Sequence, residues 1–205
     1  MRNIKNYLLI ISLTLTLISA CTESVHQTEQ SLESLEKEHQ KKLEALVNPK
    51  LSIGQRFLSH GSTIEVIETK AKSRIEYKSY KNSVNDIKKE AKLRMWSQNK
   101  INYKIQSLPR GGNILIHVFS NTIDSANTKW WEYIVLSLNG KEILRKRGSN
   151  NIPDFTTSRT SATIWWNIDV VPLTNDNSQP FKVFVIDILS KKRSGFIVYP
   201  NMVKN

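Results

Sequence analysis

The residues of this chain that could do chemistry are few and lie far apart in the sequence. The four histidines are His26, His39, His60 and His117. No two of them have the close spacing of a zinc site. Nucleophilic hydrolysis needs a serine or cysteine near a histidine, but there is no Gly-x-Ser-x-Gly turn and only one cysteine. The loop Gly-x-x-x-x-Gly-Lys, which holds phosphates, is also missing. The sequence therefore favours a non-enzymatic protein with no cofactor and no metal.

Two carboxylates on expected strands, Asp169 and Asp187, keep an enzymatic alternative open. Paired carboxylates can act as general acid and base in glycan hydrolysis, although nothing in the sequence singles out these two. His117 lies between Leu115 and Phe119 on an expected strand, which favours a core histidine over a catalytic base. The enzymatic alternative, an enzyme acting on glycan or lipid, therefore has no carboxylates assigned to it.

Two pairs of adjacent tryptophans, Trp130-Trp131 and Trp165-Trp166, are candidates for a binding surface. Neighbouring residues of a strand face opposite ways, so one of each pair is expected in the core. On the strand expected at 163–171, the aliphatic residues with Trp166 are assigned to the inner face. The outer face then carries Trp165, Asn167 and Asp169, an indole beside an amide and a carboxylate that could bind a sugar or peptide. Alternatively, helices from the N-terminal part cover this face and bury Trp165.

A third candidate surface is basic. Its residues are Lys141, Arg145, Lys146 and Arg147 on one expected hairpin, Lys191, Lys192 and Arg193 on the last expected loop, and the segment 70–94, with nine basic and three acidic residues. The formal charge of the whole sequence is +12, which favours polyanions such as phospholipid head groups, wall polymers or nucleic acid. A solvated charged surface without a partner is the alternative.

The elements that must position these residues are mostly strands. Period-two alternation predicts strands at 51–57, 62–68, 101–106, 113–119, 130–138, 141–147, 163–171, 181–189 and 195–199. Asn139-Gly140 predicts a tight hairpin with positive φ at both residues. Its register would place Leu136 opposite Ile143 and Val135 opposite Leu144, so we expect this hairpin to be buried on both faces.

Two amphipathic helices are expected before the sandwich. The first begins near Thr28 and ends at Pro49, with a stripe of Leu32, Leu35, Leu43 and Leu46. The second covers 70–96, where Tyr77, Tyr80, Val84, Ile87, Ala91 and Met95 recur every three or four residues. The predicted fold class is therefore α+β and β-dominant, a C-terminal antiparallel β-sandwich preceded by two amphipathic helices.

The first 21 residues resemble the export signal of bacterial lipoproteins. A basic start, 1–6, precedes an apolar run at 7–18, which is shorter than the ~20 residues that span a bilayer. The run ends in Leu17-Ile18-Ser19-Ala20-Cys21, which resembles the lipobox. This resemblance implies that Cys21 carries lipid and becomes the mature N-terminus. An ordinary secretory signal with an incidental cysteine is the alternative.

The resemblance to lipoproteins implies that the protein is located in a bacterial cell envelope. Thr22 follows the cysteine in place of the aspartate that favours inner-membrane retention, so the outer membrane is favoured if the cell has one. The mature chain has 28 basic and 18 acidic residues. We expect it to act as an interaction module for an envelope protein or an anionic polymer, with the membrane as a partner through Cys21 and no nucleic acid. The expected parts are a signal at 1–20, a tether at 21–30, a helical and hairpin region at 31–96 and a sandwich at 101–200.

A second resemblance covers fewer than twenty residues of the early hairpin. Ile53-Gly54-Gln55, with Gly61-Ser62-Thr63-Ile64-Glu65-Val66 after it, resembles the opening hairpin of immunoglobulin-like domains in some extracytoplasmic lipoproteins. The resemblance implies a sandwich fold and carries no function.

Overall fold

The computed structural model describes residues 51–157, 163–176 and 178–200 of the 205-residue chain. All of them belong to one unit, Val47–Asn205. The expected signal peptide, Cys21, the tether and the first helix lie outside the described residues.

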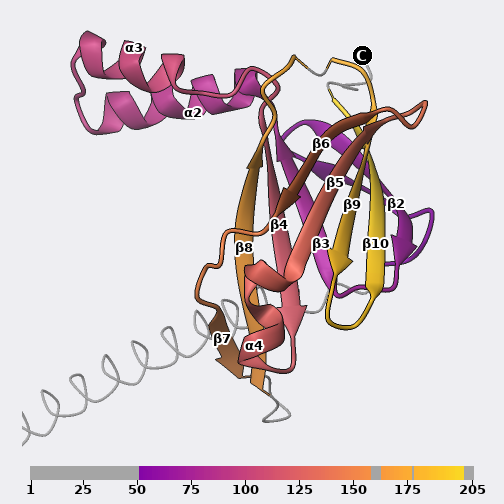
Figure 1. Cartoon of the computed structure of the whole chain (residues 1–205). Helices are drawn as coiled ribbons and strands as arrows, with labels where there is room; N and C mark the ends of the chain where they lie inside the picture. The colour runs from indigo at the N-terminus through magenta and orange to yellow at the C-terminus, as the bar shows by residue number, and fades with distance from the viewer. Residues whose placement is uncertain (1–50, 158–162, 177, 201–205) are drawn as a thin grey trace, which may run out of the picture. The chain divides into compact units, whose positions relative to one another are not determined.

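Ten strands of the described residues form two antiparallel sheets (Figure 1). The larger sheet has the order β1 (Arg56–Ser59), β2 (Ser62–Thr69), β10 (Lys192–Tyr199), β9 (Phe181–Asp187), β5 (Trp131–Ser137) and β6 (Glu142–Arg147). The smaller has the order β3 (Ser73–Lys78), β4 (Asn113–Ser120), β8 (Thr163–Pro172) and β7 (Asp154–Thr157). The β-dominant α+β class with sandwich-like sheets is thus confirmed. Because β1, β2 and β3 belong to these sheets, the sandwich begins well before residue 101, where it was expected.

The core lies between the inner faces of the two sheets. Alternate residues of β2, β4 and β9 point into it, as the period-two pattern requires. Trp131 and Tyr133 of β5 are among the largest fully buried side chains, so one member of the first tryptophan pair enters the core as predicted. Tyr77 of β3 meets Phe181 of β9 edge to face, with ring centroids 5.4 Å apart. This contact joins the two sheets through aromatic packing.

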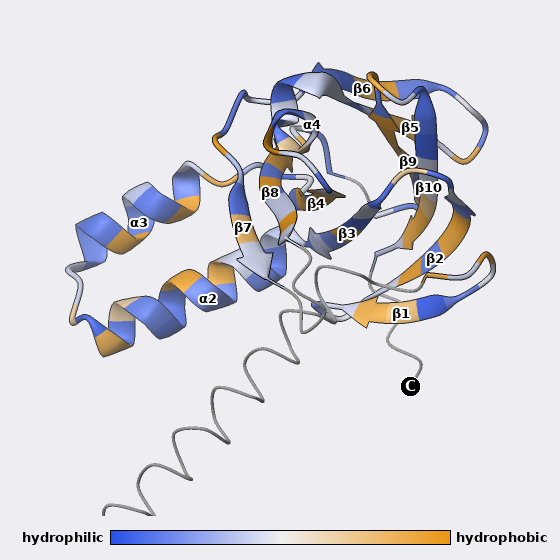
Figure 2. Ribbon diagram, turned by 90° about the horizontal axis from the view of Figure 1, so that it is seen from below, coloured by the Kyte–Doolittle hydropathy of each residue, from blue (hydrophilic) through white to orange (hydrophobic). Residues whose placement is uncertain are grey.

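In the described part of the chain, four helical elements connect the strands. The helices α2 (Tyr80–Leu93) and α3 (Gln98–Gln106) lie between β3 and β4, and α4 (Ile123–Ala126) and the 3-10 turn η1 (Thr128–Trp130) lie between β4 and β5. The pair α2–α3 extends away from one end of the sheets (Figures 1 and 2). Two serines cap these helices: Ser79 accepts a hydrogen bond from the backbone N–H of Asn82, and Ser97 accepts one from that of Lys100.

The predicted helix at 70–96 is only partly right. Its first third is the strand β3, and the helix begins at Tyr80. Ser73, Ile75 and Tyr77 alternate into the core, because β3 pairs with β4 along its whole length. Tyr77 therefore belongs to a period-two pattern, although its distance from Tyr80 also fits a helical stripe. The helical pair follows β3 within the sandwich and does not precede it.

The predicted strand at 101–106 is wrong, because these residues form the helix α3. The alternating residues Ile101, Tyr103 and Ile105 mimic a strand, but Ile101 and Ile105 are also one helical turn apart. Ser97 supplies an N-cap. In the described structure this segment pairs with neither sheet, so local capping favours the helix and no strand partner opposes it.

The hairpin formed by β5 and β6 is present, with part of its register as predicted. Val135 lies opposite Leu144, but a bulge places Leu136 opposite Glu142 and not Ile143. Of Asn139 and Gly140, only Gly140 has a positive φ, +88°. The connection is therefore a three-residue loop with glycine in the left-handed position. Because β6 is an edge strand, Ile143 and Leu144 stay partly exposed. The prediction of burial on both faces was wrong.

Candidate functional site

The predicted polar face of β8 points inward, the reverse of the expectation. Asn167 and Asp169 are only 6% and 2% exposed, whereas Val170 is exposed. The Asp169 carboxylate accepts hydrogen bonds from the backbone N–H and the hydroxyl of Ser149, each at 2.9 Å. The Asn167 amide donates to the carbonyl of Asn151 at 2.8 Å. Both side chains therefore hold the segment that follows β6, and they form no exposed platform.

The second tryptophan pair is half-buried on both sides of β8. The Trp165 ring lies 5.2 Å from that of Phe155, its register partner on β7. Trp165 is therefore neither the fully exposed indole of the binding hypothesis nor fully buried under a covering helix.

Several of the predicted basic residues are already engaged within the fold. Arg145 pairs with Glu132 and Glu142. Lys146 lies 3.7 Å from the Asp169 carboxylate and donates to the carbonyl of Val170. These contacts compensate much of the positive charge on β6.

The remaining basic candidates do not gather at one place. Arg193 pairs with Glu68 at 2.7 Å. Lys141, beside the β5–β6 loop, lies where β9 begins, whereas Lys191 and Lys192 lie where β9 ends. Arg147 is also at the latter end, opposite Glu132. The seven predicted residues therefore form no single basic patch.

The far end of the α2–α3 pair carries exposed apolar side chains among lysines. We call Leu93, Met95, Trp96, Lys100 and Lys104 the hairpin tip. Leu93 is 84% and Met95 91% exposed. The ammonium groups of Lys100 and Lys104 lie 4.5 and 5.0 Å from the centroid of the Trp96 ring, within the range of cation–π attraction.

The turn that ends α2 fixes the conformation of the backbone at the hairpin tip. Met95 has a φ of +49°, and the N–H of Trp96 donates to the carbonyl of Ala91 at 3.0 Å. This six-to-one bond, with the residue before it in the left-handed region, is the Schellman type of helix end, where glycine is usual. Ser97 then caps α3 at once. The tip is therefore held by hydrogen bonds, although α3 has no buried residue.

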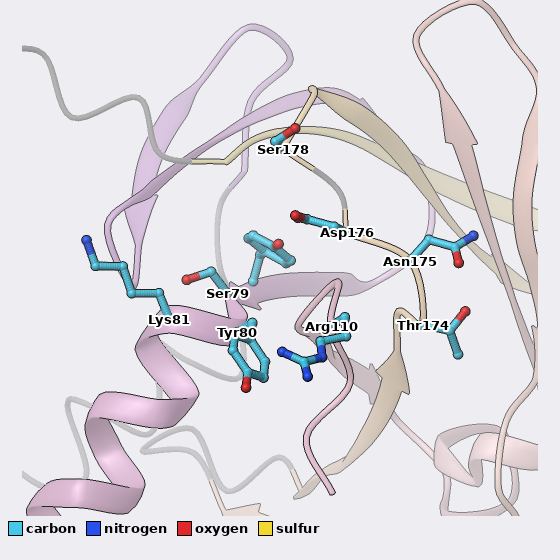
Figure 3. A pocket seen from close by; sticks show the side chains of 9 residues that line it. Ser79, Tyr80, Lys81, Arg110, Thr174, Asn175, Asp176 and Ser178 are labelled. Atoms are coloured by element: carbon cyan, nitrogen blue, oxygen red, sulfur yellow. The ribbon is translucent and has the colours of Figure 1, made fainter. Parts of the chain in front are cut away.

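A pocket of about 560 Å³ lies at the other end of the helical pair (Figure 3). It is lined by Tyr77, Ser79, Tyr80, Lys81, Arg110, Thr174, Asn175, Asp176 and Ser178. These come from the end of β3 and the start of α2, the turn before β4 and the loop between β8 and β9. The Arg110 guanidinium lies 5.0 Å from the centroid of the Tyr80 ring, beside which Figure 3 shows it.

Two of the loops that contribute to this pocket are in tight contact with each other. The N–H of Gly111 donates to the carbonyl of Leu173 at 2.7 Å. A Cβ at Gly111 would lie 2.0 Å from the carbonyl oxygen of Asn175, so only glycine fits. The Tyr77 hydroxyl donates to the Gly111 carbonyl at 2.9 Å. Burial, together with the charge of Asp176, raises the pKa of Tyr77 to about 12, so it stays protonated at neutral pH.

Two histidines far apart in sequence meet one carboxylate on the smaller sheet. The Nε2 atom of His60 lies 3.2 Å from Oε2 of Glu76, and that of His117 lies 3.4 Å from Oε1. The contact from His117 lowers the pKa of Glu76 to about 2, with a smaller contribution from His60. His117 is largely buried, with 12% of its side chain exposed, on the face of β4 opposite the core. It is a paired histidine rather than a core one.

Sequence reasoning missed the tip and the pocket for different reasons. Met95 was assigned to a buried helical stripe, although its neighbours Leu93 and Trp96 among basic residues were a usable signal of exposure. The pocket unites three segments that no local pattern connects. Among the described residues, no group of three or more His, Cys, Asp or Glu side chains is arranged to hold a metal ion.

None of the described helices has the length and apolar character needed to cross a bilayer. No protein-family model matches the sequence, and neither a curated protein nor a solved structure matches it.

Proposed function

We propose that this chain is a lipid-anchored, non-enzymatic protein of a bacterial envelope, and that its sandwich presents the α2–α3 pair to an envelope protein or an anionic polymer. The lipobox ending in Cys21 supports the anchor and the location, with the outer membrane favoured where there is one. One observation carries the interaction role: Leu93, Met95 and Lys100 of the hairpin tip are exposed, at the end of a helical pair that extends away from the sheets (Figure 2).

The exposure of Leu93 and Met95 is unusual on physical grounds. Burying a side chain of this size stabilises a protein by about 1.5–3 kcal/mol. A short helix such as α3 also gains most of its stability by docking an apolar face, yet α3 buries none of its residues. A contact with a partner would supply the burial that the isolated chain lacks.

The arrangement of carboxylates also favours binding over catalysis. An enzyme acting on glycan or lipid would place a carboxylate beside an acid–base partner within a pocket. The described pocket combines Asp176 with Tyr77, whose pKa near 12 suits a structural hydrogen bond better than proton transfer at neutral pH. Glu76 and His117 are not among the residues that line it.

The anchor is tested with the variant Cys21→Ser. We expect a full-length precursor that keeps its signal and takes up no label from a lipid analogue, because the thiol is the group to be acylated. Wild-type protein from the same cells is the control. Continued labelling of the variant would refute the anchor.

The interaction role is tested by cross-linking in intact envelopes. A photoreactive amino acid at Met95 is expected to form adducts, whereas the same amino acid at the exposed Lys191, on the β9–β10 connection, is not. Equal adducts from both positions, or none from Met95, would contradict the assignment of the tip as the contact surface. This result is independent of the labelling of Cys21.

A further inference from the structure

We infer that the hairpin tip docks on the head groups of an anionic phospholipid bilayer. This inference rests on the proposed function and names its partner. Three features of the described residues carry it: the charge at the tip, the kinds of apolar side chain beside that charge, and the shape in which the fold presents them.

The charge at the tip is positive and poorly compensated. Residues 91–106 contain Lys92, Arg94, Lys100 and Lys104 and no acidic residue. Arg94 pairs with Glu90 of α2 at 3.0 Å. Within the described part of the chain, Lys100 and Lys104 have no carboxylate at ion-pair distance, and their ammonium groups lie over the Trp96 ring. Such lysines are free to approach lipid phosphates, whose surface potential attracts each of them.

The apolar side chains are of the kinds that enter a membrane interface. Tryptophan concentrates at the head-group level, because its ring is apolar and its N–H is polar. Leu93 and Met95 beside it are almost fully exposed. A short surface with apolar residues on one side and lysines around them is typical of segments that lie in the interface without spanning the bilayer.

The shape of the hairpin favours a membrane over a protein partner. A stable interface between two proteins needs about 800 Å² from each partner, which a tip of five side chains at the end of two helices does not provide. A bilayer needs only a few inserted residues, and a lipid on Cys21 would keep the domain near it at high effective concentration. Since α2 has 14 residues, it is about 21 Å long. The tip can therefore touch lipid while the pocket stays in solvent.

The inference is tested with residues 22–205, made without signal and lipid so that only the protein surface can bind. The probe is flotation with vesicles of phosphatidylcholine alone or with about one third phosphatidylglycerol. We expect at least about tenfold more binding to the anionic vesicles, falling as salt rises from about 50 to 500 mM. Equal binding to both vesicles, or binding that ignores salt, would overturn the inference.

A matched pair of variants locates the contact. Lys100→Gln with Lys104→Gln is expected to reduce binding about tenfold. Lys191→Gln with Lys192→Gln removes the same charge at the β9–β10 connection, and we expect less than a twofold change. An equal loss of vesicle binding in both double variants would mean that binding depends on the net charge of the protein, and would refute docking by the tip. All four residues are exposed or partly exposed, and thermal unfolding checks that each variant is folded.

The fluorescence of Trp96 reports whether the tip inserts into the bilayer. Brominated lipids in the anionic vesicles are expected to quench the fluorescence of the wild type, and Trp96→Phe should lose most of that quenching while its four other tryptophans remain. Unchanged quenching in the variant would refute insertion. If the vesicle tests fail while the photoreactive Met95 still captures an acidic protein, the membrane inference falls and the interaction module stands.

Discussion

The Asp169 carboxylate on β8 accepts both the backbone N–H and the hydroxyl of Ser149, which lies just after β6, at 2.9 Å each. A strand of the smaller sheet is thereby joined to the segment that follows β6 of the larger sheet, through a carboxylate that is 2% exposed. Lys146, at 3.7 Å, compensates its charge. Deep burial, together with the charge of Asp169, raises the pKa of Tyr133, so its hydroxyl stays protonated. This buried polar group fixes where the chain leaves the edge of the larger sheet.

We expect Asp169→Ala to lower the free energy of unfolding by about 2–4 kcal/mol, because it leaves the Ser149 N–H without its acceptor and the Lys146 ammonium without its opposite charge. The matched variant Ser149→Ala removes one hydroxyl and keeps the backbone bond, and should cost about 1 kcal/mol. Urea denaturation of both variants checks this. Equal losses would mean that the carboxylate contributes no more than one hydrogen bond.

Glu76 makes stability depend on acid pH. Its folded pKa of about 2 lies below the ordinary 4.5, so its contribution is complete above about pH 4.5 and is lost as the pH falls towards 2. Because the side chain is 22% exposed, we expect Glu76→Gln to cost roughly 1–2 kcal/mol at pH 7 and only a small part of that at pH 2, where about half of the Glu76 carboxyl groups are still ionised. Unfolding measured across this range gives the difference curve.

The control for Glu76 is Glu90→Gln, which removes the exposed pair with Arg94 on α2. It should cost less than about 0.5 kcal/mol at any pH. A difference between wild type and Glu76→Gln that stayed constant from pH 7 to pH 2 would show that its cost does not come from ionisation.

Gly111 is expected to be intolerant of any side chain. Gly111→Ala places a Cβ 2.0 Å from the Asn175 carbonyl oxygen, and moving the two loops apart breaks the bond to Leu173. We expect a loss of about 3 kcal/mol or more. Gly54→Ala is the contrast: its φ of +84° is strained, but no atom lies within 4 Å of the added Cβ, so about 1 kcal/mol is expected. Thermal denaturation ranks the two, and similar losses would argue against the clash.

The α2–α3 pair should be removable without unfolding the sandwich. Lys78 and Asn113, which flank the insertion, are register partners on β3 and β4, so a short Gly-Ser linker in place of 80–107 can join the strands. The helices bury only Ser83 and Ala91, and the Lys78–Asp86 ion pair at the surface adds little.

We therefore expect a loss of helical circular dichroism and a fall of less than about 2 kcal/mol in unfolding free energy for this deletion. A chain that no longer unfolds cooperatively would mean that the helices belong to the core. The same deletion should abolish binding to the anionic vesicles, which links the stability measurement to the contact inferred for the tip.

Features set by neighbouring residues could be predicted from the sequence. The strands at 113–119 and 181–189 follow from alternation, and the β5–β6 hairpin follows from Asn139-Gly140, because a turn and its two strands are close in the chain. The β-dominant class follows from the same local signals. The lipobox is also local, and it remains a prediction from sequence alone.

Three features depended on residues far away in the sequence. They are which face of β8 is buried, where the helix before β4 begins, and the contact of His60 and His117 with Glu76. On β8, the aliphatic and polar residues alternate, and the sequence alone favours burying the aliphatic set. The fold buries Asn167 and Asp169 because Ser149 and Asn151 satisfy their hydrogen bonds there.

In the same way, His60 and His117 reach Glu76 from 16 and 41 positions away, once β1, β3 and β4 are in place. The sequence by itself determined most of the strands and the turns between them, because those choices depend mainly on residues a few positions apart. Only the tertiary structure decided which polar groups are buried together and which apolar ones are left at the hairpin tip, because these depend on partners brought close by folding.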